Sequence, residues 1–181
     1  PETEYRHLAG PGSMYDYMHS DECPIDILLE AAQSATKPGK GEVSAYLEYL
    51  ESDHPAIRYW GVTGLLIHLE QAVPFIPALE KASLDRSSSV AVLAAEALFR
   101  LGKEEMASAA YLRILSSADY GMLDRNFALN SMDATGISAA ELKDFVRELY
   151  ESKKESLQGF ARFNAYDFLV SEHLLEQWNE L

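Results

Sequence analysis

The chain has 181 residues, 48% of them hydrophobic, and a formal net charge of −14. That length and apolar content are enough for one domain with a real core, so the chain is not a disordered tail. The acidic balance argues against binding nucleic acid or an anionic membrane surface, because both need clustered lysines and arginines. We interpret the acidity as a solvated, self-repelling surface.

Cysteine use and hydropathy leave the compartment open. The single cysteine, Cys23, excludes a disulfide within the chain but does not indicate a location. No apolar run approaches the roughly 20 residues of a membrane span. The chain opens on Pro1 without an initiator methionine or a signal peptide, so we expect a processed chain or part of a longer polypeptide.

The first 22 residues show no sustained hydrophobic period and contain the turn sequence Gly10-Pro11-Gly12. We expect residues 1–22 to be an irregular lead-in from an upstream domain and residues 23–181 to form one helical domain. Pro24 suits the first position of a helix. The apolar residues that follow it have helical spacing: Ile25, Leu28, Leu29 and Ala32.

The clearest helical segment runs from Asp53 to Leu69. Pro55 opens the helix, because a missing N–H costs nothing in the first turn. One stripe along it is formed by residues at helical spacing: Ile57, Gly61, Gly64, Leu65 and His68. A shorter amphipathic helix precedes it, from Glu42 to Glu51.

Weaker copies of this helix recur about every 33 residues. The first four stripe positions correspond to Val90, Ala94, Ala97 and Leu98 in the second copy, and to Asp124, Ala128, Ser131 and Met132 in the third. The two middle positions are small in every copy, which lets a neighbouring helix approach closely. Gly102 and Gly136 follow the second and third copies, as helix-ending glycines do.

Each copy is paired with a first helix. We predict these first helices at residues 75–84 and 104–115, a further helix after Ser138, and a poorly fitting last helix from Gln158 to Val170. Two helices in about 33 residues are typical of an α-solenoid. The sequence therefore predicts an all-α fold, a HEAT-like α-α superhelix of about four to five helix pairs. The main alternative is a non-repeating helical bundle.

The sequence Asp53-x-Pro55-x-Ile57-Arg58 resembles the inter-helix turn and second-helix start of HEAT repeats. In that family the Asp and Arg form a polar ladder between stacked repeats. The resemblance implies an incomplete ladder here, and stacking less regular than in long HEAT arrays. The second turn contains Asp85 and Arg86 but has Ala91 at the arginine position, and the third copy has Arg125.

A narrower resemblance covers roughly residues 1–135. The segments Ile57–Leu66, Ser88–Lys103 and Asp124–Gly136 resemble the C-terminal helical extension of bacterial sulfatases, of the arylsulfatase and heparan N-sulfatase type. In the lead-in, Pro1–Arg6 and Tyr15–Met18 resemble the segment that joins the catalytic domain to that extension.

The sulfatase resemblance implies a parent enzyme that hydrolyses sulfate esters or N-sulfates of glycans. Such enzymes use calcium and a formylglycine made from a Cys/Ser-x-Pro-x-Arg motif. Cys23-Pro24 lacks the intervening residue and the arginine, so the resemblance implies a non-catalytic extension without a cofactor of its own. Its expected partner is the upstream catalytic domain or another protein, with sulfated glycan reached through the parent. A periplasmic or exported location follows only if the resemblance holds.

The residues themselves predict no catalytic, cofactor-binding or metal-binding site. His19, Asp21, Glu22 and Cys23 are metal-compatible residues, but they lack a recognised ligand spacing. Cys23 has no obvious activating partner. His68 lies on the apolar stripe and is interpreted as structural.

A solenoid often binds partners on the face lined by its second helices. We predict an interaction surface on that face, rich in the aromatic, arginine and amide side chains of interfaces: Arg58, Tyr59, Trp60, Arg125, Asn126, Asn130, Arg162 and Asn164. Two other interpretations stay open, with Trp60 as a core residue and Arg58 as a brace of the Asp53 turn.

Three functions are compatible with the sequence. The leading hypothesis is a domain that packs on a sulfatase catalytic domain or helps to present sulfated glycan to it. The second is a free-standing HEAT-like adaptor that binds a protein or peptide. The third is an enzyme in its own right.

Overall fold

The structure is a computed structural model that describes residues 10, 12–37, 43–154 and 166–180. Every regular element within these ranges is a helix, which confirms the predicted all-α fold class. In chain order the helices are α2 (Met14–Met18), α3 (Ile25–Thr36), α4 (Val43–Leu50), α5 (Pro55–Ile67), α6 (Leu69–Ala72), the 3-10 helix η1 (Val73–Phe75), α7 (Ile76–Ala82), α8 (Ser88–Arg100), α9 (Glu104–Ser116), α10 (Met122–Thr135), α11 (Ala140–Lys154) and α13 (Tyr166–Gln177).

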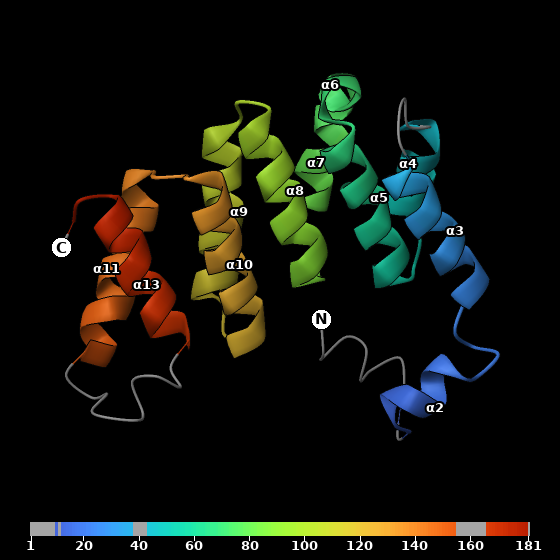
Figure 1. The fold of residues 1–181 in the computed structure, drawn as a ribbon, viewed down its shortest axis with the longest axis horizontal. Coiled ribbons are helices and arrows are strands. Elements are labelled where there is room, and N and C mark those ends of the chain that lie inside the picture. The colour runs from blue at the N-terminus through green and yellow to red at the C-terminus, as the bar shows by residue number, and fades with distance from the viewer. Residues whose placement is uncertain (1–9, 11, 38–42, 155–165, 181) are drawn as a thin grey trace.

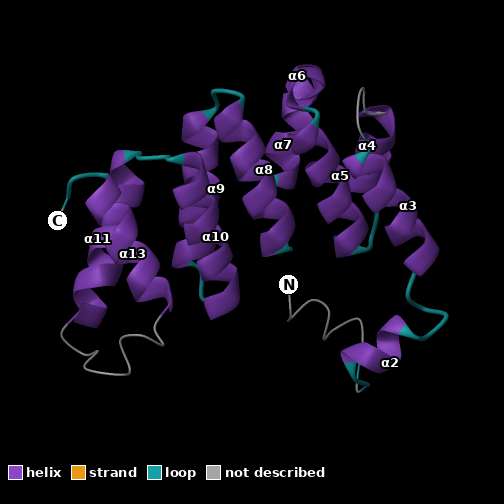
Figure 2. Cartoon of the chain, viewed as in Figure 1, coloured by secondary structure: helices purple, strands orange, loops and turns teal. Residues whose placement is uncertain are grey.

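The helices stack as pairs in an elongated array (Figures 1 and 2). One layer contains α3, α5, α8, α10 and α13, each in contact with the next. In the other layer, α4 pairs with α5, α7 with α8, α9 with α10, and α11 with α13. This is the arrangement of a solenoid, in which each pair buries its apolar faces against its neighbours.

The three copies found in the sequence become α5, α8 and α10, which lie side by side in one layer. Gly102 and Gly136 end the second and third copies with φ of 75° and 72°. Left-handed backbone of this kind favours glycine, because it has no Cβ to clash. Both predicted helix ends are therefore confirmed.

The second pair differs from the sequence prediction between α5 and α7. The chain there forms α6 and η1 before α7 begins at Ile76, so the predicted first helix at residues 75–84 is shorter. Pro74 lies in η1 and Pro77 in the first turn of α7. Proline lacks the N–H that a continuous helix needs, so each is placed where a new helical segment begins.

The two ends of the chain also differ from expectation. The lead-in contains a short helix, α2, whose start is fixed by a capping box between Ser13 and Asp16. The predicted last helix, Gln158–Val170, lies partly outside the described residues, and α13 continues beyond it to Gln177. Ser171 interrupts the apolar period of α13, but it is buried and its hydroxyl donates to Asp167 O at 2.6 Å.

The small residues of α5 allow α4 to approach closely. A Cβ on Gly64 would lie 2.7 Å from the ring of Tyr46, and a Cβ on Gly61 would lie 2.8 Å from Tyr46 O. Tyr46 is fully buried, stacks on His68, and donates its hydroxyl to Ser34 O in α3 at 2.9 Å. Its ring is held from several sides and has little room to shift.

We predict that Gly64→Ala destabilises the chain by about 1–3 kcal/mol, the usual effect of overpacking a core. The loss should appear in urea unfolding even though alanine is the better helix former by about 1 kcal/mol. Thr63→Ala is the control, because Thr63 is half-buried and its hydroxyl donates to Tyr59 O in its own helix. An increase in stability for Gly64→Ala would contradict the close α4–α5 contact.

Candidate interaction surface

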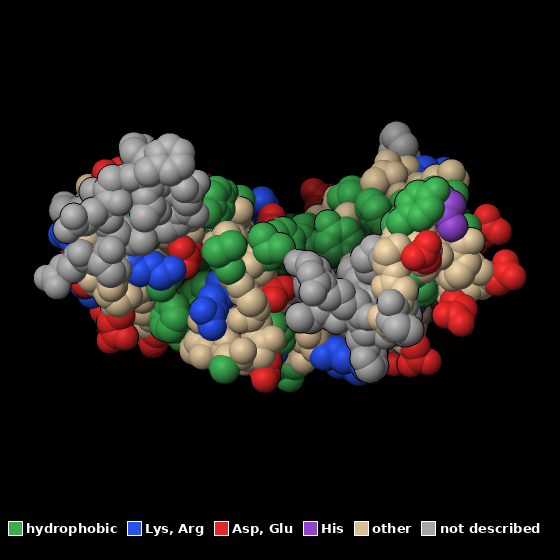
Figure 3. Space-filling view, turned by 90° about the horizontal axis from the view of Figure 1, so that it is seen from below, with side chains coloured by type: hydrophobic (Ala, Val, Ile, Leu, Met, Phe, Trp, Pro, Cys, Tyr) green, Lys and Arg blue, Asp and Glu red, His purple; other side chains and the backbone are tan. Residues whose placement is uncertain are grey.

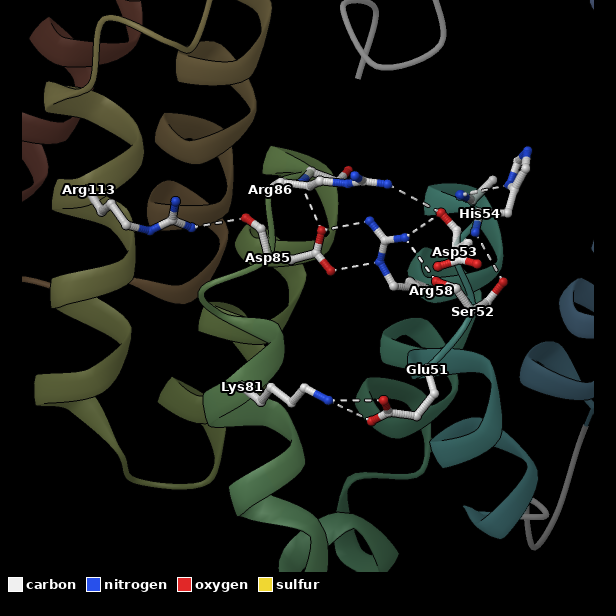
Figure 4. A network of polar contacts seen from close by, with 11 residues as sticks. Glu51, Ser52, Asp53, His54, Arg58, Lys81, Asp85, Arg86 and Arg113 are labelled. Carbon is white, nitrogen blue, oxygen red and sulfur yellow. Dashed lines mark hydrogen bonds and ion pairs between the residues drawn. The ribbon is translucent and has the colours of Figure 1, made fainter. Parts of the chain in front are cut away.

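A largely buried ion pair joins two successive inter-helix turns (Figure 4). Arg58 lies in the first turn of α5, and Asp85 lies in the turn between α7 and α8. Arg58 Nε and Nη2 donate to the two carboxylate oxygens of Asp85 at 2.7 and 2.9 Å. Arg58 Nη1 donates to Ser52 O and Asp53 O, both at 2.9 Å. These bonds brace the Asp53 turn. Arg58 is 7% exposed, so it does this from within the protein.

The second turn, between α7 and α8, also bonds to the start of α8 and to α9. Asp85 Oδ1 also accepts from Ser87 N at 2.8 Å, directly before α8 begins. Arg113 of α9 donates through Nη2 to Ser83 O and Asp85 O at 3.0 and 3.3 Å, and through Nη1 to the Tyr120 hydroxyl at 2.7 Å. One guanidinium therefore links the second turn to the third.

The ladder gap predicted at Ala91 is bridged by other residues. The Ser88 hydroxyl, at the start of α8, donates to Asp124 Oδ1 at 2.6 Å. Asp124 Oδ2 accepts from Gly121 N at 2.8 Å, which fixes the start of α10. Arg125 donates to Ser117 O at 3.1 Å and holds the third turn. Between the second and third pairs, a serine–aspartate contact therefore stands at the place where an arginine was expected, in addition to the Arg113 contacts.

Two predicted surface residues, Tyr59 and Trp60, are half-buried on α5. They pack against the core, and their rings contact each other edge to face at 5.6 Å. Trp60 is thus partly a core residue and partly open to solvent. Its repeat equivalents are Leu93 in α8 and Phe127 in α10, so neighbouring helices carry apolar side chains at one level. Phe127 is half-buried, whereas Leu93 on the helix between them is buried.

The amide residues occupy different environments. Asn130 is exposed and its Oδ1 accepts from the Tyr166 hydroxyl of α13 at 2.9 Å. Asn126 is 9% exposed, and its Oδ1 is buried without a hydrogen-bond partner. The structure therefore brings Asn130 to the surface and places Asn126 inside. Arg162 and Asn164 lie outside the described residues.

Three exposed apolar side chains lie in or next to the inter-helix turns. Leu84, Met122 and Leu123 are each more than half exposed. They lie in or beside the second and third turns, at the lower side of the array in Figure 1. Viewed from that side, apolar side chains cover part of the middle of the molecule (Figure 3). Leu84 lies between helices and so belongs to no helical period, whereas Met122 and Leu123 are the first two residues of α10.

The other layer carries a groove of about 680 Å³ between α4 and α7. Leu47, Leu50 and Leu84 contribute its apolar lining. Lys81 and Glu51 form an ion pair across it, with Nζ to Oε1 at 2.8 Å. Both side chains are largely exposed, so this pair adds little stability and can part without much cost.

Several polar groups of the described residues make contacts within the protein. No group of three or more His, Cys, Asp or Glu residues within the described ranges is arranged to hold a metal ion. In the cluster that includes Cys23, the thiol is buried and His19 Nδ1 bonds to Tyr15 O at 2.8 Å. Burial raises the pKa of Tyr111 well above its usual value, and its hydroxyl bonds to Ser131 Oγ at 2.8 Å inside the core.

No known protein family, curated protein or solved structure matches this chain. Among the described helices, none is by itself long and apolar enough to cross a membrane.

We predict that Arg58→Ala destabilises the chain by about 3 kcal/mol, because it leaves the largely buried Asp85 carboxylate without its cationic partner. Thermal or urea unfolding measures the loss. Arg100→Ala is the matched control, since Arg100 is exposed and pairs only with Glu96 one turn away. The control should change stability by less than about 0.5 kcal/mol. Equal effects of the two variants would show that the buried pair does not hold the turns.

Proposed function

We propose that this chain is the non-catalytic helical-repeat domain of a bacterial sulfatase, and that it packs on the catalytic domain upstream. The observation that supports this best is that the segments resembling the sulfatase extension are α5, α8 and α10. These three helices form one continuous layer. The proposal includes the HEAT type of the repeat, which the bonded turns at Asp53 and Asp85 support.

The role proposed for the domain is binding rather than chemistry. The bonded turns make a firm scaffold, and the half-buried Trp60 and Phe127 give it apolar contact points of the kind enriched in interfaces. The formylglycine and calcium of a sulfatase would belong to the parent, since Cys23 is buried and is followed directly by Pro24. They would supply the sulfate-ester hydrolysis there.

Charge favours packing on the catalytic domain over direct glycan contact. The chain carries a net charge of −14, which repels a sulfated polymer at a distance. We therefore propose that sulfated glycan meets the parent's catalytic domain and that this chain supports that domain.

The second candidate is a free-standing HEAT-like adaptor. The exposed Leu84, Met122 and Leu123 favour it, because they are apolar contact points open to a partner. Leu84 also lines the groove between α4 and α7, which offers a protein partner a concave apolar site.

The reading frame that precedes Pro1 separates the two candidates. We expect it to encode a Cys/Ser-x-Pro-x-Arg motif in the same polypeptide. A full upstream sequence without that motif would rule out the sulfatase proposal and leave the adaptor. If the motif is present, the whole polypeptide should be compared with one lacking residues 23–181. We expect a lower melting temperature for the shortened enzyme, because it loses its packing partner.

We predict that the 181-residue chain alone does not hydrolyse aryl sulfate esters. The measurement is release of the aryl group over time, with the whole polypeptide as the positive control. Turnover that disappears in Cys23→Ala would contradict the non-catalytic assignment.

A further inference from the structure

We propose that the groove between α4 and α7 binds a basic amphipathic helix of a partner protein, and that an arginine of that helix replaces Lys81 as the partner of Glu51. This inference rests on the second candidate function, protein binding, for the kind of partner. It is independent of the sulfatase proposal and adds the chemistry that the partner must have.

The groove lies between the two shortest helices of its layer. α4 has 8 residues and α7 has 7, whereas α9 has 13 and α11 has 15. At 1.5 Å per residue, α4 and α7 extend only about 10–12 Å. The groove between them has a volume of about 680 Å³. This part of the layer therefore has space for the side chains of one more helix.

Apolar side chains line both walls of the groove. Leu47 and Leu50 come from α4, and Ala78 and Ala82 come from α7. Within each helix the two residues are three or four positions apart, so they share one face. Leu84, just after α7, also lines the groove and is 69% exposed. Walls of this kind suit a helix with apolar side chains along one face.

The rim of the groove is acidic. Glu48 and Glu51 are exposed, and Lys81 is the only basic side chain among the described lining residues. The third acidic lining residue, Asp85, is already bound by Arg58. The lining residues lie at the C-terminal ends of α4 and α7, whose last carbonyls add partial negative charge. A basic side chain of a partner is therefore favoured at this rim.

The ion pair across the groove indicates which group the partner presents (Figure 4). Lys81 Nζ donates to both carboxylate oxygens of Glu51, at 2.8 and 3.0 Å. The two side chains are 72% and 70% exposed, so water screens the pair and its loss costs little. A partner arginine can bind the same carboxylate through two parallel hydrogen bonds, and its helix shields them from water. Lys81 is thus an internal competitor for this place.

Charge also decides between a different protein and a second copy of this chain. The chain carries a net charge of −14, so two copies repel each other. A helix with a basic face is attracted to the same surface. The occupant we infer is therefore a basic helix of a different protein.

Fluorescence anisotropy with a labelled helical peptide tests this assignment on the 181-residue chain. The probe is a hydrocarbon-stapled helix with leucines at i, i+4 and i+7 and one arginine beside them, and the control peptide has glutamate in place of the arginine. We expect the arginine peptide to bind more tightly, on the order of tenfold, because Glu51 attracts one peptide and repels the other. Equal affinities, or binding of neither peptide, would overturn the proposal.

Two charge variants should change the affinity for the arginine peptide in opposite directions. Glu51→Gln should weaken binding about fivefold, whereas Lys81→Ala should tighten it about twofold, because the competitor for Glu51 is removed. Glu105→Gln is the control, since it removes the same charge at the exposed start of α9 and should leave the affinity unchanged. Weaker binding by Lys81→Ala would contradict the exchange of partners at Glu51.

Two apolar variants locate the bound peptide. Leu84→Ser should weaken binding, whereas Leu123→Ser, which alters a side chain of similar exposure outside the groove, should not. Urea unfolding checks that both variants fold. Equal effects of the two variants would overturn the site, and dimerisation abolished by Leu84→Ser would identify a second copy as the occupant. A reading frame without the sulfatase motif would reject the leading function, whereas binding insensitive to the groove variants would reject only this inference.

Discussion

The register of the first two turns of the array depends on the contact between Arg58 and Asp85. The pairs α4–α5, α7–α8 and α9–α10 are each joined by a short turn, and they can stack in register only if successive turns are held at a fixed separation. The planar guanidinium does this by binding a carboxylate of one turn and two carbonyls of the other. A buried pair of this kind contributes more to one defined geometry than to net stability, because desolvation offsets much of the attraction.

Much of the fold was predictable from sequence because the repeat is marked by residues whose effect on the backbone is local. Gly102 and Gly136 end helices by their own backbone preference, and the small residues Gly61 and Gly64 mark a close approach without naming the partner. That partner, Tyr46, could not be deduced, since any bulky residue of the preceding helix would fit the same pattern. Which residue of one helix contacts which residue of another depends on the tertiary arrangement. No periodic pattern in the sequence records those contacts.

The candidate surface was harder to predict than the fold. Arg58 is of a residue type that is enriched in interfaces, but its burial depends on Asp85, which lies 27 positions away. The apolar stripe of α3 was visible in the sequence, yet only the structure shows that the array covers a different side of that helix. Sequence periodicity gives the direction of an apolar face, whereas the width of cover depends on how many neighbours the helix has.

The arginine contacts carry a consequence for how much the turns can vary in sequence. Arg58, Arg113 and Arg125 bind main-chain carbonyls of Ser52, Asp53, Ser83, Asp85 and Ser117. A carbonyl is present whatever the side chain, so most substitutions in these turns preserve the acceptors. The turns can therefore diverge while keeping their shape, and two arrays with this geometry can share few identical residues there. Such a fold preserves the path of the backbone, and a comparison of amino-acid sequences detects that path poorly.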